Sequence, residues 1–365
     1  MAAQTIRGTE GKALSLQVAR DDVHRVRVAE TSPAEPGPGE ALFEVERFGV
    51  SANNVTYALF GDELRYWDLF PAETGWGQIP VWGYLRAVAS RSGEVETGRR
   101  AFGLCPMSTH VLMRPDRGDA AGFRDASGCR SAVPGVYNAY FWADGDSPGS
   151  RAGDLLVVLR PLFWLSFTLD CYLAEHDGLT SGAVITSASS KAAIGLAHLL
   201  RGRGVPTVGL TSPRHAGFVG ETSEYGAVAG YDQLGALAAL TGPRTTLIDV
   251  AGNPALRQEI GGQLAGRLTS VLVAGSTHGD GNPASSAADG LFSAPRQIRD
   301  LSRRWGWPVL QQRFTAALDG FAASATWLTV ETAHGIGGLA RVYHGVLGNN
   351  SSPAVAHVVD LTTEN

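Results

Sequence analysis

The chain has few cysteines, few lysines and no long apolar run. Its 365 residues include three cysteines, too few for a disulfide framework or a four-thiolate zinc site. Arg160 and Pro161 interrupt the apolar run Leu155–Leu159, so no stretch approaches the roughly 18 apolar residues of a membrane span. The segment Met1–Arg20 lacks the apolar core of a signal peptide. We therefore expect a cytoplasmic protein that does not span a membrane.

An excess of positive charge is also missing. The formal net charge is −5, and Lys12 and Lys191 are the only lysines. The chain thus lacks the basic field with which proteins bind nucleic acids. Hydrophobic residues make up 44% and charged residues 18%, which is typical of a globular protein. The length exceeds the roughly 250–300 residues that one core supports, so we expect two domains.

The first third of the chain reads as short strands joined by turns. Ala13–Val18, Arg25–Ala29 and Glu40–Val50 carry β-branched or alternating apolar residues. The stretch Leu59–Gly83 that follows is rich in aromatic side chains. These side chains either fill a core or form the wall of a small-molecule pocket. The residues concerned are Phe60, Tyr66, Trp67, Phe70, Trp76 and Trp82.

The region from 183 to 275 alternates short apolar strands with helical patterns. Such alternation is typical of βαβ units and predicts a parallel, doubly wound sheet. The helical patterns are Ala192–Leu200 and Leu256–Leu264. The expected strands are Ala183–Ser187, Pro206–Thr211, Ala227–Tyr231, Thr246–Val250 and Ser270–Gly275. Further along the chain we expect helices at Pro295–Trp305, Leu310–Ala323 and Gly335–Leu347, and strands at Trp327–Glu331 and Ala354–Leu361.

The turn after the first of these strands is a candidate phosphate-binding loop. The usual glycine fingerprint is absent, and small residues stand in its place: Ser187, Ala188, Ser189 and Ser190. Small side chains let a pyrophosphate approach the backbone, and the following helix offers free N–H groups. Lys191 adds the only lysine of this region. The alternative is an ordinary serine N-cap followed by a solvated lysine.

The end of the second strand favours NADP(H) over NAD(H), if a dinucleotide binds. An acidic residue there would accept from a free ribose 2′-hydroxyl, whereas arginine would pair with a 2′-phosphate. The segment ends in Ser212 and Arg214, and the next acidic residue is Glu221. Arg214 is then a phosphate ligand, or alternatively a surface arginine on a turn.

Several stretches resemble the medium-chain dehydrogenase/reductase superfamily in its zinc-independent, quinone-oxidoreductase-like branch. Within that branch the chain is similar to the DUF2855 family. The resemblance covers most of the chain, and the Ser-Ala-Ser-Ser-Lys stretch is its most specific part. The matching stretches are 51–61, Ile79–Gly83, Arg160–Phe163, Ser187–Lys191, Ala193–Leu196 and Asp249–Gly252.

The resemblance implies an α/β protein with a GroES-like β-barrel domain and a doubly wound Rossmann domain. The implied domains are 1–155 for the barrel and 156–300 for the Rossmann domain, with 301–365 returning to pack on the barrel. It also implies NADP(H) as cofactor, with Thr168 near the nicotinamide. The implied cofactor residues are Thr168, Ser187, Ala188, Ser189, Ser190, Lys191, Ser212, Arg214, Asp249, Ala251, Ala274 and Gly275.

Two departures from relatives bear on the chemistry. Zinc-dependent relatives carry Gly-His-Glu where this chain has Gly83-Tyr84-Leu85, so we expect no metal. Relatives often carry Asn-Pro-x-Asp near the substrate, and here Tyr57 stands at the acidic position after Asn54. We expect Tyr57 to act as proton donor with Asn54 orienting it, and Tyr66 as the second candidate. Each tyrosine is equally well explained as a buried core residue.

Three functions remain open at this point. The first is a zinc-independent, NADPH-dependent reductase of an enone, quinone or related carbonyl compound. The second is a lyase, isomerase or hydrolase of a polyketide-like or aromatic metabolite on the same scaffold. The third is a binding protein without turnover. We expect a small-molecule substrate, no nucleic-acid or membrane partner, and a homodimer, because relatives are commonly dimers.

Overall fold

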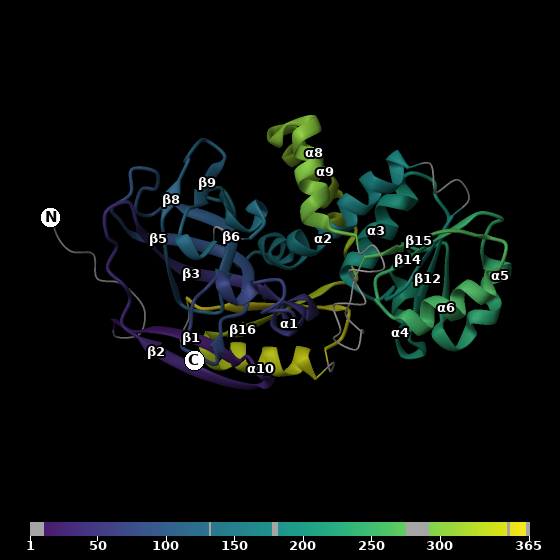
Figure 1. The fold of residues 1–365 in the computed structure, drawn as a ribbon, viewed down its shortest axis with the longest axis horizontal. Helices are drawn as coiled ribbons and strands as arrows, with labels where there is room; N and C mark the ends of the chain where they lie inside the picture. Colours follow the sequence, from purple (N-terminus) through teal and green to yellow (C-terminus); the bar gives the residue numbers. More distant parts are fainter. Residues whose placement is uncertain (1–10, 131–132, 177–181, 275–291, 349–350, 363–365) are drawn as a thin grey trace. The chain divides into compact units, whose positions relative to one another are not determined.

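The protein folds into two compact units, each described here by itself (Figure 1). The computed structural model describes residues 11–130, 133–176, 182–274, 292–348 and 351–362. The first unit comprises Met1–Val158, Val330–Ser351 and Val355–Asn365. The second unit comprises Leu159–Thr329 and Ser352–Ala354. Both helices and strands are present throughout, which confirms the expected α/β class.

The first unit is built mainly from antiparallel strands. A three-stranded sheet has the order β2-β1-β4, and a nine-stranded sheet runs β16-β17-β3-β5-β6-β10-β9-β8, with β7 also paired to β3. Strand β3 is buried along almost its whole length, as expected for a central strand. The strands are β1 (Ala13–Ala19), β2 (Asp22–Thr31), β3 (Ala41–Val50), β4 (Trp76–Gly77), β5 (Pro80–Ser90), β6 (Arg100–Pro106), β7 (His110–Met113), β8 (Pro115–Asp116), β9 (Gly122–Asp125), β10 (Ala139–Trp142), β16 (Thr329–His334) and β17 (Val355–Asp360).

Short helices complete the first unit. Helix α1 (Ala52–Leu59) follows β3 directly, and Ser51 with Asn54 forms a capping box at its start. Helix α10 (Gly335–Leu347) precedes β17 and buries Leu339 and Tyr343. Three single turns of 3₁₀-helix connect the strands: η2 (Tyr66–Asp68), η3 (Gly128–Arg130) and η4 (Gly135–Asn138).

Within the first unit, the buried side chain of Arg47 links the C-terminal strand β17 to strand β3. Arg47 of β3 donates from Nε to Asp154 Oδ1 at 2.6 Å and also pairs with Asp360 of β17. It donates further to Thr332 Oγ1 in β16, at 3.1 Å. Removing two carboxylates and a guanidinium from water costs free energy, and their close pairing offsets this cost.

Helix α2 (Arg151–Glu175) continues through Pro161, which ordinarily kinks or breaks a helix. Proline has no N–H to bond the carbonyl of Val157. Gly49 of β3 lies against that carbonyl so closely that a Cβ would come within 2.7 Å of the oxygen. Among the described residues, α2 alone is long and apolar enough to cross a membrane. However, 67% of its apolar window is buried inside the protein, as in a core helix.

The second unit contains a five-stranded parallel sheet of order β13-β12-β11-β14-β15. The strand order reverses between β11 and β14, as in a doubly wound fold, which confirms the expected architecture. The strands are β11 (Ala183–Ile185), β12 (Thr207–Thr211), β13 (Ala227–Gly230), β14 (Thr245–Asp249) and β15 (Leu268–Val273). The helices are α3 (Lys191–Gly202), α4 (Pro213–Glu221), η5 (Tyr231–Ala236), α5 (Leu237–Leu240), α6 (Pro254–Gln263), α8 (Ala294–Trp305) and α9 (Trp307–Ser324).

Residues 301–329 lie in the second unit, although we had assigned them to the segment that returns to the barrel. The reason is aromatic packing between α9 and α2. Phe314 stacks on Trp164 with ring centroids 3.7 Å apart, and Phe321 stacks on Phe163 at 5.3 Å. The chain rejoins the first unit only at Val330, and the first boundary falls after Val158 rather than after 155.

Candidate functional site

The carboxyl edge of the parallel sheet carries the first group of candidate residues. Asp249, at the end of β14, is fully buried. Its carboxylate accepts from Thr186 Oγ1 at 2.7 Å, from the Gly252 N–H at 3.0 Å and from Arg257 Nη1 at 2.8 Å. The Ala251 N–H donates to Thr186 Oγ1 at 3.0 Å. Asp249 therefore joins the loops after β11 and β14, where the strand order reverses.

The loop after β11 makes the tight turn that glycine makes in the usual fingerprint. Ser187 has a φ of +50°, in the left-handed region that L residues rarely adopt. Its N–H donates to the Tyr231 hydroxyl at 2.9 Å. The Ala188 N–H donates to the Leu210 carbonyl at 2.9 Å, and the Ala188 carbonyl accepts from the Tyr225 hydroxyl at 3.0 Å. Strand β12 and the two tyrosines that flank β13 thus hold the loop in place.

Ser190 and Lys191 begin helix α3. Ser190 Oγ accepts from the Ala193 N–H at 3.2 Å, so it is the N-cap that we considered as the alternative reading. Lys191 Nζ donates to the Pro353 carbonyl at 3.1 Å. Burial lowers the pKa of Lys191 to about 8.

Gly195 supplies the close helix packing that the missing fingerprint glycines supply elsewhere. A Cβ at this position would approach Ser166 Oγ to 2.9 Å and the Phe163 ring to 3.0 Å. Ser166, in turn, donates to the Ala192 carbonyl at 2.7 Å. Helices α2 and α3 therefore meet at a position that only glycine fits.

A cluster of hydroxyl and basic groups lies at the ends of β11 and β12. His215 Nδ1 lies 3.2 Å from Ser212 Oγ and 3.4 Å from Ser189 Oγ. Arg214 is exposed beside it on the first turn of α4. Within the described part of the chain, neither Ser212 nor His215 has a carboxylate as a partner. The sequence analysis missed His215, although its place three residues after Ser212 was a usable signal.

The other residues predicted to bind the cofactor lie outside this cluster of hydroxyl and basic groups. Thr168 is fully buried, and its hydroxyl donates to the Trp164 carbonyl at 2.6 Å within its own helix. Ala251 is buried after β14, and the Ala274 N–H donates to the Asp249 carbonyl at 2.8 Å. Gly275 lies outside the described residues.

The first unit holds a cluster of three tyrosines, the second group of candidates. The rings of Tyr57 and Tyr66 are 4.5 Å apart, and the hydroxyl oxygens of Tyr66 and Tyr137 are 3.2 Å apart. Tyr57 leaves helix α1, Tyr66 begins η2, and Tyr137 lies in η4. Tyr137 was not among the predicted site residues, because nothing near it in the sequence distinguishes it from a core aromatic.

All three tyrosines have a raised pKa and are neutral at physiological pH. Burial raises the pKa of Tyr57 above its ordinary value, and the neighbouring Tyr66 raises it further. Hydrogen bonds from the side chains of Asn53 and Trp82 offset part of that rise. Burial likewise raises the pKa of Tyr66 and of Tyr137. Neutral phenols that stay protonated can donate hydrogen bonds across the physiological pH range.

The structure gives Asn54 a different role from the one expected. Its Oδ1 accepts from the Ser51 N–H at 2.8 Å, and its Nδ2 donates to the Pro80 carbonyl at 3.0 Å. Both ends of the buried amide are therefore used to hold the start of α1 against β5. The amide that bonds Tyr57 is Asn53.

The position of the zinc-binding histidine of relatives is occupied by a structural tyrosine. Tyr84 is fully buried in β5, and its hydroxyl donates to Asp146 Oδ2 at 3.0 Å. Among the described residues, no group of three or more His, Cys, Asp or Glu side chains is placed to hold a metal ion.

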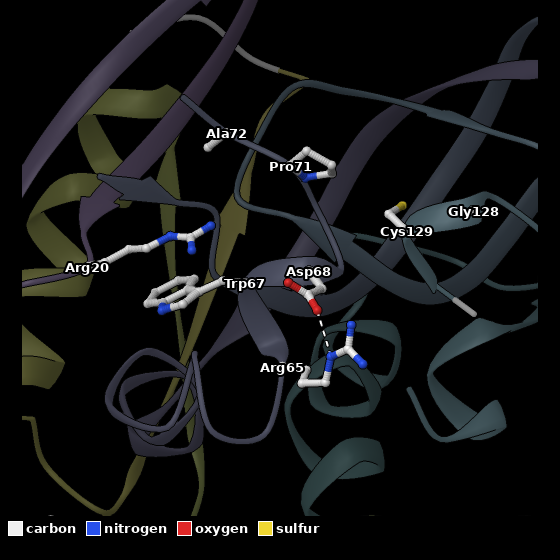
Figure 2. Close-up of a pocket in the computed structure, with 8 residues that line it drawn as sticks. All are labelled: Arg20, Arg65, Trp67, Asp68, Pro71, Ala72, Gly128 and Cys129. Carbon is white, nitrogen blue, oxygen red and sulfur yellow. Dashed lines mark hydrogen bonds and ion pairs between the residues drawn. The ribbon is translucent and has the colours of Figure 1, made fainter. Parts of the chain in front are cut away.

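An open hollow of about 380 Å³ lies on the first unit, and none of the three tyrosines lines it (Figure 2). The Arg65 guanidinium pairs with Asp68 at 2.7 Å, and the Arg20 guanidinium lies 5.9 Å from the centre of the Trp67 ring. Trp67 itself is almost completely buried. The hollow's lining is completed by Pro71, Ala72, Gly128 and Cys129. Arg65 is thus neutralised within the hollow, which leaves little to bind a charged ligand.

Comparisons with known proteins agree with this architecture. The model of the DUF2855 family, described as a protein of unknown function, matches residues 48–351. No curated protein sequence matches the chain.

Solved structures of low identity share the fold. Etr1p in complex with NADP and crotonyl-CoA is 11% identical, covers 96% of this chain and 100% of its own, and has a TM-score of 0.61. Mycobacterial Rv1454c complexed with NADPH is 14% identical over 96% and 100%, with a TM-score of 0.59. A Pseudomonas syringae quinone oxidoreductase is 12% identical over 96% and 100%, with a TM-score of 0.59. These proteins have a GroES-like and a Rossmann domain, which confirms the expected fold.

Proposed function

The chain belongs to the DUF2855 family, and we propose that it is a zinc-independent, NADPH-dependent reductase of an enone, quinone or related carbonyl compound. The observation that carries the proposal is the cluster of Ser189, Ser212, Arg214 and His215 at the carboxyl edge of a doubly wound sheet. Dinucleotides bind at this edge in such folds. The proposal assigns cofactor binding to the second unit and proton donation to the first.

The donors at the ends of β11 and β12 fit a phosphate group. Two hydroxyls, an imidazole and an exposed guanidinium are the groups that proteins use to bind phosphate oxygens. The left-handed turn at Ser187 brings the backbone of the loop to the edge of the sheet. Several proteins with this fold have structures in complex with NADPH or NADP, and these complexes support the same cofactor for this chain.

The tyrosine cluster supplies what a reduction without zinc requires. Bound NADPH would supply a hydride, and the substrate oxygen would gain negative charge. Tyr57 and Tyr66 are protonated at neutral pH, as phenols ordinarily are, and burial raises the pKa of both further. Each is therefore a hydrogen-bond donor to the developing negative charge and the source of the proton that the substrate oxygen takes up. Asn53 and Trp82 hold the Tyr57 hydroxyl in position. The aromatic surroundings favour a planar, apolar substrate such as a quinone or an enone.

One set of observations favours the non-redox alternative. The N–H groups of Ser187 and Ala188 already bond Tyr231 and Leu210, and the ammonium of Lys191 bonds the Pro353 carbonyl. These groups are therefore engaged within the protein rather than left free for a pyrophosphate. A lyase, isomerase or hydrolase of a polyketide-like or aromatic metabolite would use the tyrosines alone.

Two measurements on the whole protein test the proposal. Calorimetric titration with NADPH and NADH establishes whether a dinucleotide binds and which is preferred. Loss of NADPH absorbance with a series of quinones and enones then measures reduction. We expect tighter binding of NADPH and turnover of at least one electron-poor carbonyl compound. Binding of neither cofactor would contradict the proposal and leave the non-redox alternative.

We also propose that the enzyme works in the cytoplasm as a homodimer. The support is strand β15, which ends the order of the parallel sheet among the described residues and leaves Val271 45% exposed, because an unpaired edge strand can pair with another chain. Light scattering coupled to size-exclusion chromatography measures the mass directly. A monomer at micromolar concentration would contradict the dimer.

A further inference from the structure

His215 lies between two serines that come from different strands. Ser189 belongs to the loop after β11, and Ser212 is the residue before α4. The same ring nitrogen, Nδ1, is within reach of both hydroxyls, at 3.4 Å and 3.2 Å. Ser212 stands at the N-cap of α4, but its side chain makes no capping hydrogen bond and bonds the ring instead. One imidazole therefore spans the ends of the two strands.

The charges around this ring are all accounted for in the described residues. Arg214 precedes His215 on α4, and its positive charge lowers the pKa of the ring. Lys191, at the start of α3, donates to the Pro353 carbonyl. Beyond β13, Tyr231 accepts from the Ser187 N–H, and Asp232 follows it. Glu221 lies at the far end of α4.

The ring is therefore uncharged near neutral pH. Burial lowers the pKa of His215 below its ordinary value, and the positive charge of Arg214 lowers it further. A phosphate dianion beside the ring would have the opposite effect, because an anion favours the protonated imidazole.

We propose that His215 is a proton-linked specificity residue for the 2′-phosphate of NADPH. The inference rests on the proposed cofactor function. When the phosphate occupies the space beside Ser189, Ser212 and Arg214, the ring takes up a proton from the solvent. One N–H bond forms on the imidazole, and the resulting cation donates to the phosphate while the serine hydroxyls remain partners. A dinucleotide without the phosphate binds with no proton uptake.

The sign of the pH dependence follows from this linkage. Between the pKa of the free ring and that of the phosphate-bound ring, binding takes up protons, so affinity falls as the pH rises. A phosphate monoester loses its second proton near pH 6. Above about pH 6.5 the phosphate is therefore mostly a dianion, and the pH dependence of binding reports mainly the titration of the ring. Discrimination between NADPH and NADH should therefore be largest near pH 6.5 and smallest near pH 8.5.

Titration calorimetry with two small probes tests the subsite directly. Adenosine 2′,5′-bisphosphate carries the phosphate, and adenosine 5′-monophosphate lacks it. Each is titrated from pH 6.5 to 8.5 in two buffers that differ in ionisation enthalpy and contain no phosphate. For the bisphosphate we expect proton uptake and an affinity that falls roughly tenfold across the range. For the monophosphate we expect neither.

Three variants test whether His215 is the group that takes up the proton. His215→Asn should abolish the proton uptake and flatten the pH dependence while leaving the monophosphate affinity unchanged. His176→Asn, at an exposed histidine near the end of α2, is the matched control and should behave as wild type. Arg214→Ala should weaken bisphosphate binding at every pH but keep the proton uptake.

Two results would overturn the inference. One is tight, NADPH-selective binding with no proton uptake, which would leave the proposed cofactor intact and remove His215 from its selection. The other is uptake that persists in His215→Asn. Failure of NADPH, NADH and both probes to bind would contradict the proposed function itself and the inference with it.

Discussion

The hydroxyl oxygens of Tyr66 and Tyr137 lie 3.2 Å apart, although 71 positions separate the two residues in the chain. Tyr57 completes the cluster through ring contact with Tyr66. These phenols are protonated at neutral pH, and burial raises their pKa further. A hydroxyl already held in a packed cluster needs little rearrangement before it donates to a developing negative charge. The cluster therefore gives the reductase proposal its acid.

Replacing Tyr57 by phenylalanine tests the acid. The ring and most of its buried area remain, so Tyr57→Phe should fold with a nearly unchanged melting temperature. Removing one preorganised donor costs about 2.7–4 kcal/mol in the barrier, so turnover should fall by about 100-fold or more. Steady-state kinetics with calorimetric measurement of NADPH affinity separates this loss from a loss of binding.

Tyr84→Phe is the matched control, because it removes a buried hydroxyl of the same unit that bonds Asp146. Unchanged turnover in Tyr57→Phe would take Tyr57 out of the mechanism and make Tyr66→Phe the next variant. If both variants turned over normally, the proton would have to come from water or from the cofactor ribose instead.

Arg214 should discriminate between the two dinucleotides. Arg214→Ala removes a guanidinium that is exposed at the end of β12 and has no acidic partner in the described residues. We expect NADPH affinity to fall by about 1.5–3 kcal/mol, the scale of a charge-assisted hydrogen bond, and NADH affinity to stay nearly the same. Calorimetry measures both. Arg244→Ala, at an exposed arginine before β14, is the control; equal affinities of the wild-type protein for NADPH and NADH would refute the assignment.

Activity should not depend on a metal ion. Tyr84 fills the position of the zinc ligand of relatives, and its hydroxyl is committed to Asp146. Exhaustive chelation should therefore leave the melting temperature and turnover unchanged. Elemental analysis of the purified protein provides the check, and stoichiometric zinc lost together with activity would count decisively against this expectation.

We expect the buried ammonium of Lys191 to lower the free energy of unfolding at neutral pH. Burial lowers its pKa to about 8, so between pH 8 and its ordinary value of 10.5 the folded protein binds fewer protons than the unfolded chain. The contribution of this residue to the free energy of unfolding therefore rises with pH across that window. Lys191→Met should be more stable than wild type by roughly 1–2 kcal/mol at pH 7, and the gain should shrink towards pH 10.

Urea unfolding at four pH values between 7 and 10 measures this difference. Lys12→Met is the natural control, because Lys12 is the only other lysine and is half exposed beside Glu30. Parallel stability curves for Lys191→Met and wild type would show that the ammonium is not destabilised in the fold.

Local patterns in the sequence were sufficient to predict the α/β architecture. The alternation of short apolar strands with amphipathic helices from 183 to 275 predicted the parallel sheet. Strands buried on both faces read as short continuous apolar runs, and helices buried on one face show a 3.6-residue period. Ser190 as N-cap could likewise be read from neighbouring residues. The family resemblance of the Ser187–Lys191 stretch held for the same reason, since a loop is specified by contiguous residues.

The tertiary structure decided which side chains meet, and local periodicity carries no record of that. Tyr137 joins Tyr66 across 71 positions, His215 reaches Ser189 across 26, and Arg47 bonds Asp360 across 313. The helix that contains Pro161 packs closely against Gly49 of a distant strand, and the aromatic packing of α9 on α2 accounts for the place of residues 301–329. In each case the free energy of a contact between segments far apart in the chain outweighed the local preference, and only the fold brings those segments together.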